Sequence, residues 1–383
     1  MRIGITCYPS YGGSGVVATE LGRQLARRGH VVHFITYDVP FRLPRFQENV
    51  FFHEVETPSY PLFKHPPYLL ALANKMVEVA RYAELDILHV HYAIPHATSA
   101  YLAREVLEAG GDRRTPAVVT TLHGTDITLV GSEPSFSDII AFSIDRSDGV
   151  TAVSHALRAE TLKAFRVRPD IRVIHNFIDP EDYADHDRCD ERRCLAGPDR
   201  LVVTHISNFR PVKRVEVVVR VFAGAARDLP ARLVLIGDGP DVPKARREAA
   251  RLGVEDRVVF LGCQEQVAGL LAASDVFLLP SVQESFGLAA LEAMAARVPV
   301  VASRVGGLPE VVGEDEGGFL YDIGDLDGMT AGLRRLLLDD ELRRECGQRA
   351  RERAFRLFSS ERVVPEYERC YEEVLALRSG RAG

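Results

Sequence analysis

The chain has 383 residues, of which 46% are hydrophobic and 26% are charged. This length exceeds one ordinary domain and suits two domains of roughly 150 to 200 residues each. The formal net charge of −7 argues against non-specific binding of nucleic acid, because such binding needs a basic surface.

The six cysteines are scattered, without a CxxC pair or the ligand spacing of a zinc site. We therefore expect reduced thiols, no bound metal and a cytoplasmic location. The first residues have the pattern of a strand, not of a charged leader followed by an apolar segment, and no stretch reaches 18 apolar residues. These features predict a protein that is neither secreted nor membrane-spanning.

Short apolar runs alternate with helical patterns along the chain, which predicts an α/β fold with two doubly wound parallel sheets. The expected strands of the first sheet are 3–8, 31–36, 50–53, 87–91, 118–122, 150–153 and 171–174. Those of the second sheet are 201–206, 233–236, 258–261, 276–279, 300–302 and 319–321. We expect a first Rossmann-like domain over 1–179, a linker over 180–200, a second Rossmann-like domain over 201–358 and a helix over 359–383 that packs back across the domains. The two domains are expected to face each other across a cleft.

A loop and a helix over 280–297 follow the strand that ends at Leu279. In an open α/β sheet this loop lies at the carboxyl ends of the strands, where ligands bind, and the free N–H groups of the new helix favour an anion. We expect Ser285 to cap the helix. Glu284 lies in the loop, and Glu292 lies below the helix start on the side that faces the loop. The alternative, two ordinary surface acids, is disfavoured because the apolar residues around Glu292 leave little of the helix for water.

A basic segment with Arg210 and Lys213 follows the first strand of the second sheet. Cations at a strand end ahead of a helix suit a diphosphate. A solvated basic loop is the ordinary interpretation of such a segment. Lysine is scarce here, with five among 47 basic residues, so we favour a functional role for Lys213.

The first domain offers a glycine-rich turn over 12–15 and polar side chains at two adjacent strand ends. The turn precedes a helix and directs N–H groups towards a ligand. The dinucleotide fingerprint is incomplete, and no acid ends the second strand, which disfavours NAD. A single histidine at a strand end is more often a packed core residue, but five polar side chains over 89–96 and 120–126 favour a ligand site. No pair has the HExxH spacing of a zinc site.

The segment ESFGLAALE from Glu284 to Glu292, with PVVA at 299–302 and GGLPE at 306–310, resembles the donor-site signature of retaining glycosyltransferases of family 4. The resemblance extends over the whole chain. The segments GITCYPSYGGSGVVATELG, HFITYDVPFRL, TLHGTDIT, AVSHAL and HNFID are similar to a branch of this family that joins N-acetylglucosamine to L-malate in bacillithiol synthesis. The family usually has an arginine where this chain has Asn208; Arg210 is the candidate replacement, and the sequence leaves open whether it takes over that role.

The resemblance implies a GT-B fold and a retaining transfer from UDP-N-acetylglucosamine to L-malate, with no cofactor and no metal. It implies same-face substitution, in which the leaving diphosphate takes the acceptor proton. Catalytic roles are implied for Lys213, Arg210, Glu284 and His123. Contacts to the nucleotide sugar are implied for Gly13, Gly237, Gln264, Phe286, Gly287, Leu288 and Glu292. Clustering and resemblance together suggest acceptor contacts from Ser14, Tyr92, Thr121 and Asn176.

Three alternatives remain open at this point. The first is a family member that uses another acceptor, such as inositol phosphate or a lipid. The second is an epimerase on a similar fold. The third is a non-enzymatic sugar-nucleotide sensor. The apolar segment over 58–72 is poor in positive charge, which disfavours a membrane-bound acceptor. The sequence leaves the oligomeric state open, a homo-oligomer included.

Overall fold

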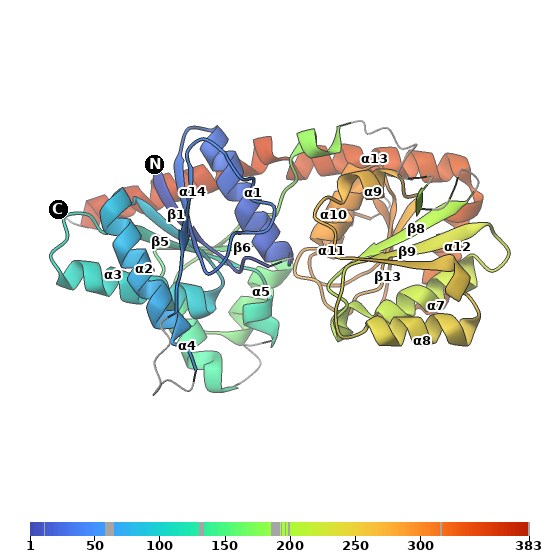
Figure 1. Ribbon diagram of the computed structural model, residues 1–383, viewed down its shortest axis with the longest axis horizontal. Helices are drawn as coiled ribbons and strands as arrows, with labels where there is room; N and C mark the ends of the chain where they lie inside the picture. Colours follow the sequence, from blue (N-terminus) through green and yellow to red (C-terminus); the bar gives the residue numbers. More distant parts are fainter. Residues whose placement is uncertain are drawn as a thin grey trace. The chain divides into compact units, whose positions relative to one another are not determined.

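The computed structural model describes residues 1–10, 12–57, 65–129, 134–184, 192, 194–195, 197, 200–314 and 316–381. The chain divides into two compact units (Figure 1), one made of Met1–His175 and Val363–Gly383 and the other of Asn176–Arg362. The first boundary therefore lies four residues before the expected domain end at 179. Most of the expected linker, including 185–191, lies outside the described residues.

The first unit contains a seven-stranded parallel sheet with the order β3-β2-β1-β4-β5-β6-β7. Its strands are β1 (Arg2–Thr6), β2 (Val31–Thr36), β3 (Val50–Glu54), β4 (Ile87–His91), β5 (Ala117–Leu122), β6 (Gly149–Ala152) and β7 (Ile171–Val173). The seven expected strands are confirmed, with ends that shift by at most two residues. Because the strand order reverses between β1 and β4, the carboxyl ends of these central strands form the switch point at which such sheets bind ligands.

Helices cover both faces of this sheet, because alternate strand residues point to opposite sides. On one face α2 (Tyr68–Ala83) and α3 (Thr98–Ala109) bury a cluster that includes Leu72, Leu88 and Leu107. On the other face α1 (Gly13–Arg27) approaches so closely that a Cβ at Gly22 would lie 2.4 Å from the Phe34 ring. The unit also contains α4 (Pro134–Asp145), α5 (His155–Ala164) and two π-helical turns, η1 (Ala93–Ala97) and η2 (Thr125–Leu129).

The C-terminal helix α14 (Ser360–Arg381) joins the first unit from Val363 onwards. Glu368 on this helix accepts hydrogen bonds from Arg28 Nε and Nη2 over 2.9 and 2.8 Å and from His30 Nε2 over 2.9 Å. Burial raises the pKa of the Glu368 carboxyl, but these hydrogen bonds outweigh burial and the pKa is lowered. Residues far apart in the sequence are thus tied together by a partly buried ion pair.

The second unit contains a six-stranded parallel sheet with the order β10-β9-β8-β11-β12-β13. Its strands are β8 (Leu201–Ile206), β9 (Ala231–Ile236), β10 (Val258–Gly262), β11 (Val276–Leu279), β12 (Val300–Ser303) and β13 (Gly318–Tyr321). All six expected strands are confirmed. The order reverses between β8 and β11, which places a second switch point at their carboxyl ends.

Helices also cover both faces of the second sheet (Figure 1). They are α7 (Val215–Ala225), α8 (Val242–Leu252), α9 (Ala268–Ala272), α10 (Leu288–Ala295), α11 (Leu308–Val312), α12 (Leu326–Leu338) and α13 (Asp340–Phe358), with turns η3 (Pro180–Tyr183), η4 (Pro211–Lys213) and η5 (Glu255–Arg257). The alternation is clear in β8, where Val203 joins the large core with α7, α8 and α12, and Val202 joins a smaller core on the other face.

Helix α7 shows that burial decides this structure more than local propensity does. It contains five valines among eleven residues, although β-branched residues are weaker helix formers. All five are buried in the large core. Full burial of a valine contributes about 1.5 kcal/mol or more, which exceeds its propensity cost.

Among the described residues, no helix is long and apolar enough to cross a membrane.

Candidate functional site

Loops that follow β8, β11 and β12 lie together in the second unit, since these strands are neighbours in the sheet. Lys213 ends the turn η4 after β8, and Glu284 lies between β11 and α10. The backbone N–H of Val282 donates to the carbonyl oxygen of Val212 over 2.9 Å and joins the first two loops. Residues 71 positions apart are thereby brought to one sheet edge.

Lys213 and Glu284 form an ion pair at this edge. Nζ of Lys213 donates to Oε1 of Glu284 over 2.5 Å, and the two side chains are 19% and 10% exposed. The hydroxyl of Ser281 donates to the same oxygen over 2.9 Å. Arg210 is exposed at the start of η4, and among the described residues it forms no ion pair. The structure therefore brings Lys213, but not Arg210, to Glu284.

The loop after β12 supports the backbone of Glu284. The N–H of Gly307 donates to the carbonyl oxygen of Glu284 over 3.0 Å. Gly306 has a φ of +51°, and a Cβ at this position would lie 1.8 Å from the same oxygen. Only glycine allows this approach, so the Gly306–Gly307 pair determines where Glu284 lies.

The expected cap of helix α10 is wrong. The residue that precedes the helix is Gly287, with a φ of +99°, and no side chain caps the N-terminus. The chain enters the helix through a left-handed conformation that glycine adopts without strain, so Ser285 lies too early to be the cap. Phe286 is buried and packs edge-on against Phe358. Glu292 is 6% exposed, in agreement with a buried acid behind the loop.

Glycines also bring the loops after β8 and β9 together. A Cβ at Gly237 would lie 1.8 Å from the carbonyl oxygen of Ser207, and one at Gly239 would lie 2.1 Å from that of Asn208. The side chain of Asn208 is exposed, at the position where an arginine was expected by resemblance. Gln264 donates from Nε2 to the carbonyl oxygen of Leu261 over 2.8 Å, so its side chain is held against the end of β10.

In the first unit, three imidazole rings stack at the carboxyl ends of β4 and β5. The ring centroids are 4.5 Å apart for His89 and His91 and 5.0 Å apart for His91 and His123. Nδ1 of His91 and Nε2 of His123 share a hydrogen bond of 2.7 Å. Burial and the neighbouring His96 lower the pKa of His123 to about 3, and burial also lowers the pKa of His91. These histidines are therefore neutral at pH 7 and serve as hydrogen-bonding groups, not as cations.

Tyr92 and Ser14 form a second polar group in the first unit. The hydroxyl of Tyr92 donates to Oγ of Ser14 over 2.7 Å. Burial raises the pKa of Tyr92 to about 12, so the phenol keeps its proton. Asp126 is buried and accepts the N–H groups of Ala93 and Gly124, each over 3.0 Å, which ties the loops after β4 and β5 together.

The other expected ligand residues differ in their surroundings. Thr121 is fully buried, and its hydroxyl bonds to His89 Nε2 and to Thr151, each over 2.7 Å, so it faces the interior of the first unit. Gly13 is exposed at the first position of α1. Asn176 belongs to the second unit, where its buried Oδ1 accepts no hydrogen bond from the described residues.

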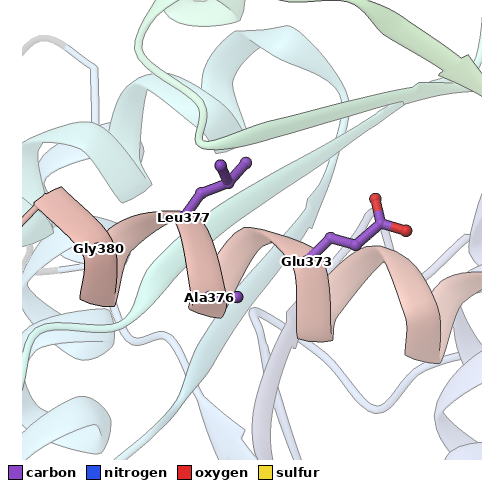
Figure 2. A pocket seen from close by; sticks show the side chains of 4 residues that line it. All are labelled: Glu373, Ala376, Leu377 and Gly380. Atoms are coloured by element: carbon purple, nitrogen blue, oxygen red, sulfur yellow. The ribbon is translucent and has the colours of Figure 1, made fainter.

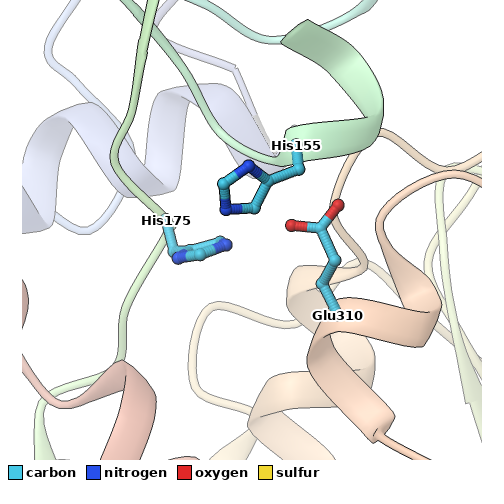
Figure 3. A group of neighbouring side chains, drawn as sticks. All are labelled: His155, His175 and Glu310. Carbon is cyan, nitrogen blue, oxygen red and sulfur yellow. The ribbon is translucent and has the colours of Figure 1, made fainter. Parts of the chain in front are cut away.

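The first unit contains two further features. A hollow on α14 is lined by Glu373, Ala376, Leu377 and Gly380 (Figure 2). The rings of His155 and His175 lie edge to face with centroids 5.8 Å apart (Figure 3).

Several residues that shape the site were not identified from the sequence. Ser281 has the sequence context of an ordinary loop serine, although its position two residues after the end of β11 was a signal. Asp126 was noted only as part of a polar segment. Tyr371 bonds to His89 Nδ1 over 2.7 Å from the C-terminal helix, and nothing in local sequence pairs residues 282 positions apart.

Comparison with known proteins identifies relatives over both units. The model of glycosyltransferase family 4 matches residues 11–182, and that of glycosyl transferases group 1 matches 190–353. N-acetyl-alpha-D-glucosaminyl L-malate synthase of Bacillus anthracis is 50% identical over 376 residues, which cover 98% of this chain and 97% of that protein. A D-inositol 3-phosphate glycosyltransferase of Saccharomonospora viridis is 29% identical, with 97% and 91% covered.

Among solved structures, the Anabaena protein HepE in complex with UDP and glucose superimposes with a TM-score of 0.79 at 21% identity. The match covers 96% of this chain and 98% of HepE. At this identity the likeness concerns the fold.

Proposed function

This chain belongs to glycosyltransferase family 4 and has the two-domain GT-B fold, and we propose that it transfers N-acetylglucosamine from UDP-N-acetylglucosamine to the hydroxyl of L-malate. The observation that carries this proposal is the 50% identity to the Bacillus anthracis malate synthase over 98% of the chain. The alternative acceptor, inositol phosphate, is supported only by relatives of lower identity, such as the protein at 29%.

The donor groups that we propose lie in the second unit. Lys213 stabilises the charge that develops on the diphosphate as the sugar leaves, aided by the N–H groups of Phe286, Gly287 and Leu288 at the start of α10. Glu284 binds sugar hydroxyls, because it is held next to Lys213 and is partly accessible. The buried Glu292 binds the ribose.

Catalysis in this proposal is electrostatic. Glycosidases that retain configuration use a second carboxylate as a nucleophile. Here Glu284 is paired with Lys213, so it is assigned to binding. The acceptor hydroxyl attacks on the face that UDP leaves, and the leaving phosphate takes its proton.

The acceptor groups that we propose lie in the first unit. The hydroxyl of Tyr92 donates a hydrogen bond to Oγ of Ser14, so the hydrogen of the Ser14 hydroxyl remains available for a carboxylate of malate. His123, which the family resemblance assigns to the donor sugar and not to the acceptor, is a neutral hydrogen-bonding group of the same unit. Neutral donors suit a small dianion whose own hydroxyl must remain reactive.

We also propose that the reaction needs no cofactor and no metal and takes place in the cytoplasm. Lys213 and the helix start supply the positive potential that a divalent cation would otherwise supply. Activity should survive EDTA, and a loss restored specifically by magnesium or manganese would contradict the proposal. The described cysteines are free thiols, in agreement with a reducing compartment.

The test of the acceptor is UDP release from UDP-N-acetylglucosamine with different acceptors. L-malate should accelerate release far more than D-malate or inositol phosphate. Succinate keeps both carboxylates but lacks the hydroxyl, so it should inhibit without turnover. Ser14→Ala should raise KM for malate and leave the affinity for UDP unchanged. A faster reaction with inositol phosphate would refute malate as the acceptor.

A further inference from the structure

Ser281 lies at the carboxyl end of β11 and contacts the acid assigned to the sugar. Its side chain is fully buried, and Oγ donates to Oε1 of Glu284 over 2.9 Å. We propose that Ser281 is a positioning residue that holds Glu284 in its sugar-binding orientation while Lys213 engages the diphosphate. This inference rests on the proposed function, which it deepens by assigning the two oxygens of Glu284 different tasks.

Among the described residues, two donors reach the Glu284 side chain, and both meet at one oxygen. Lys213 Nζ lies 2.5 Å and Ser281 Oγ 2.9 Å from Oε1. A carboxylate oxygen accepts about two hydrogen bonds, so Oε1 is filled. Oε2 accepts none from the described residues, and the side chain keeps a tenth of its surface exposed. Oε2 is therefore the atom that is open to a sugar hydroxyl.

When the donor binds, the single positive charge of Lys213 interacts with two anions, the carboxylate of Glu284 and the diphosphate. In the structure that charge pairs with Glu284. A diphosphate near Lys213 weakens this pairing, because an ammonium behaves as a single point charge. The hydroxyl of Ser281 carries no charge and does not compete with the phosphate. It keeps Oε1 occupied and so limits rotation of the carboxylate.

The backbone of Glu284 is held independently of Ser281. Gly307 N–H donates to its carbonyl oxygen over 3.0 Å. Removal of the Ser281 hydroxyl should therefore release the Glu284 side chain and leave the loop in place. Because the backbone and the side chain of Glu284 are held by different residues, a Ser281 variant measures the effect of the side-chain hydrogen bond alone.

Ser281→Ala is the direct test. A hydrogen bond to a charged group is lost, so kcat should decrease about 10- to 100-fold while the Kd for UDP stays unchanged. Calorimetry should show that the variant loses affinity for UDP-N-acetylglucosamine relative to UDP, a comparison that needs no acceptor. Ser281→Cys keeps the size of the side chain but has only a weak donor, so it should lose as much as the alanine variant.

Ser274→Ala is a matched control from the other end of β11. Ser274 is buried and bonds to Thr204 Oγ1 over 2.6 Å and to the carbonyl oxygen of Leu270 over 2.8 Å. Its replacement should lower thermal stability and leave kcat and both affinities as in the wild type. A loss of activity equal to that of Ser281→Ala would show that any buried serine here has the same effect, and would overturn the proposal.

A double-mutant cycle tests whether Ser281 acts through Glu284. In a Glu284→Ala background, Ser281→Ala should cause no further loss. Wild-type turnover in Ser281→Ala, or an undiminished loss in the Glu284→Ala background, would overturn the proposal. If the wild type did not respond to L-malate, the proposed acceptor would fail, and the calorimetric comparison would still decide the role of Ser281.

Discussion

Replacement of Gly306 by alanine should impair turnover through a clash with the backbone of Glu284. A Cβ at Gly306 would lie 1.8 Å from the Glu284 carbonyl oxygen, and real contacts are essentially never below 3.0 Å, so the two loops must separate by about 1.2 Å. The adjoining hydrogen bond from Gly307, 3.0 Å long, is strained or lost as well. Since a displacement of about 1 Å at a catalytic group can cost about 100-fold in rate, we expect kcat to decrease by roughly that factor.

The matched control is Gly253→Ala in the same unit. Gly253 also has a left-handed backbone, with φ +66°, but a Cβ there meets nothing within 4 Å. It should lose about 1–2 kcal/mol of stability from the backbone conformation alone and keep its activity. Gly306→Ala should lose about 1–3 kcal/mol more from the clash. UDP release and urea unfolding measure both effects, and a Gly306→Ala enzyme with kcat within about twofold of the control would refute this reasoning.

Further predictions concern four charged residues. Lys213→Ala removes a cation aimed at the leaving group, so kcat should decrease about 10²- to 10³-fold; an effect on KM alone would exclude the catalytic role. Glu292→Gln should weaken UDP binding by about 1.5–3 kcal/mol in calorimetry, whereas Glu284→Gln should leave it nearly intact; equal losses would contradict the assigned roles. The pKa of Glu368 is lowered in the fold, because hydrogen bonds from Arg28 and a histidine outweigh burial. Its stabilising effect should therefore be present above the unfolded pKa of about 4.5 and be lost as the pH falls below it. In acid unfolding, Glu368→Gln should lack the loss of stability that comes from protonation of Glu368. Identical profiles of stability against pH for variant and wild type would contradict this prediction.

The strands could be predicted because their signal is local. Buried parallel strands are short continuous apolar runs, and thirteen such runs became thirteen strands with ends shifted by at most two residues. Helix ends were harder to predict from the sequence, as α10 shows. Its start depends on the left-handed conformation of Gly287, and a Cβ there would lie 2.5 Å from a side-chain atom of Leu308 in the next helix. The sequence around Ser285 contains no trace of that distant contact.

Lys213 and Glu284 were each expected after a strand of the second sheet, and parallel strands bring their carboxyl ends to one edge, but the ion pair between them was not predicted. The structure added the third member, Ser281, and the oxygen on which both donors meet. Thr121 shows the opposite outcome. Thr121 also lies near the carboxyl end of a strand and was expected to contact the acceptor, but its side chain is oriented towards His89 and the interior.

The sequence by itself determined the α/β class, the two sheets and the family signature, because strand runs, glycine turns and short motifs are set by neighbouring residues. Only the tertiary structure decided which groups touch. The ion pair of Lys213 with Glu284 spans 71 positions, and the bond of Tyr371 to His89 spans 282. Such contacts depend on how strands and helices pack, and a side chain turns towards a ligand or towards the core according to the partners that packing supplies.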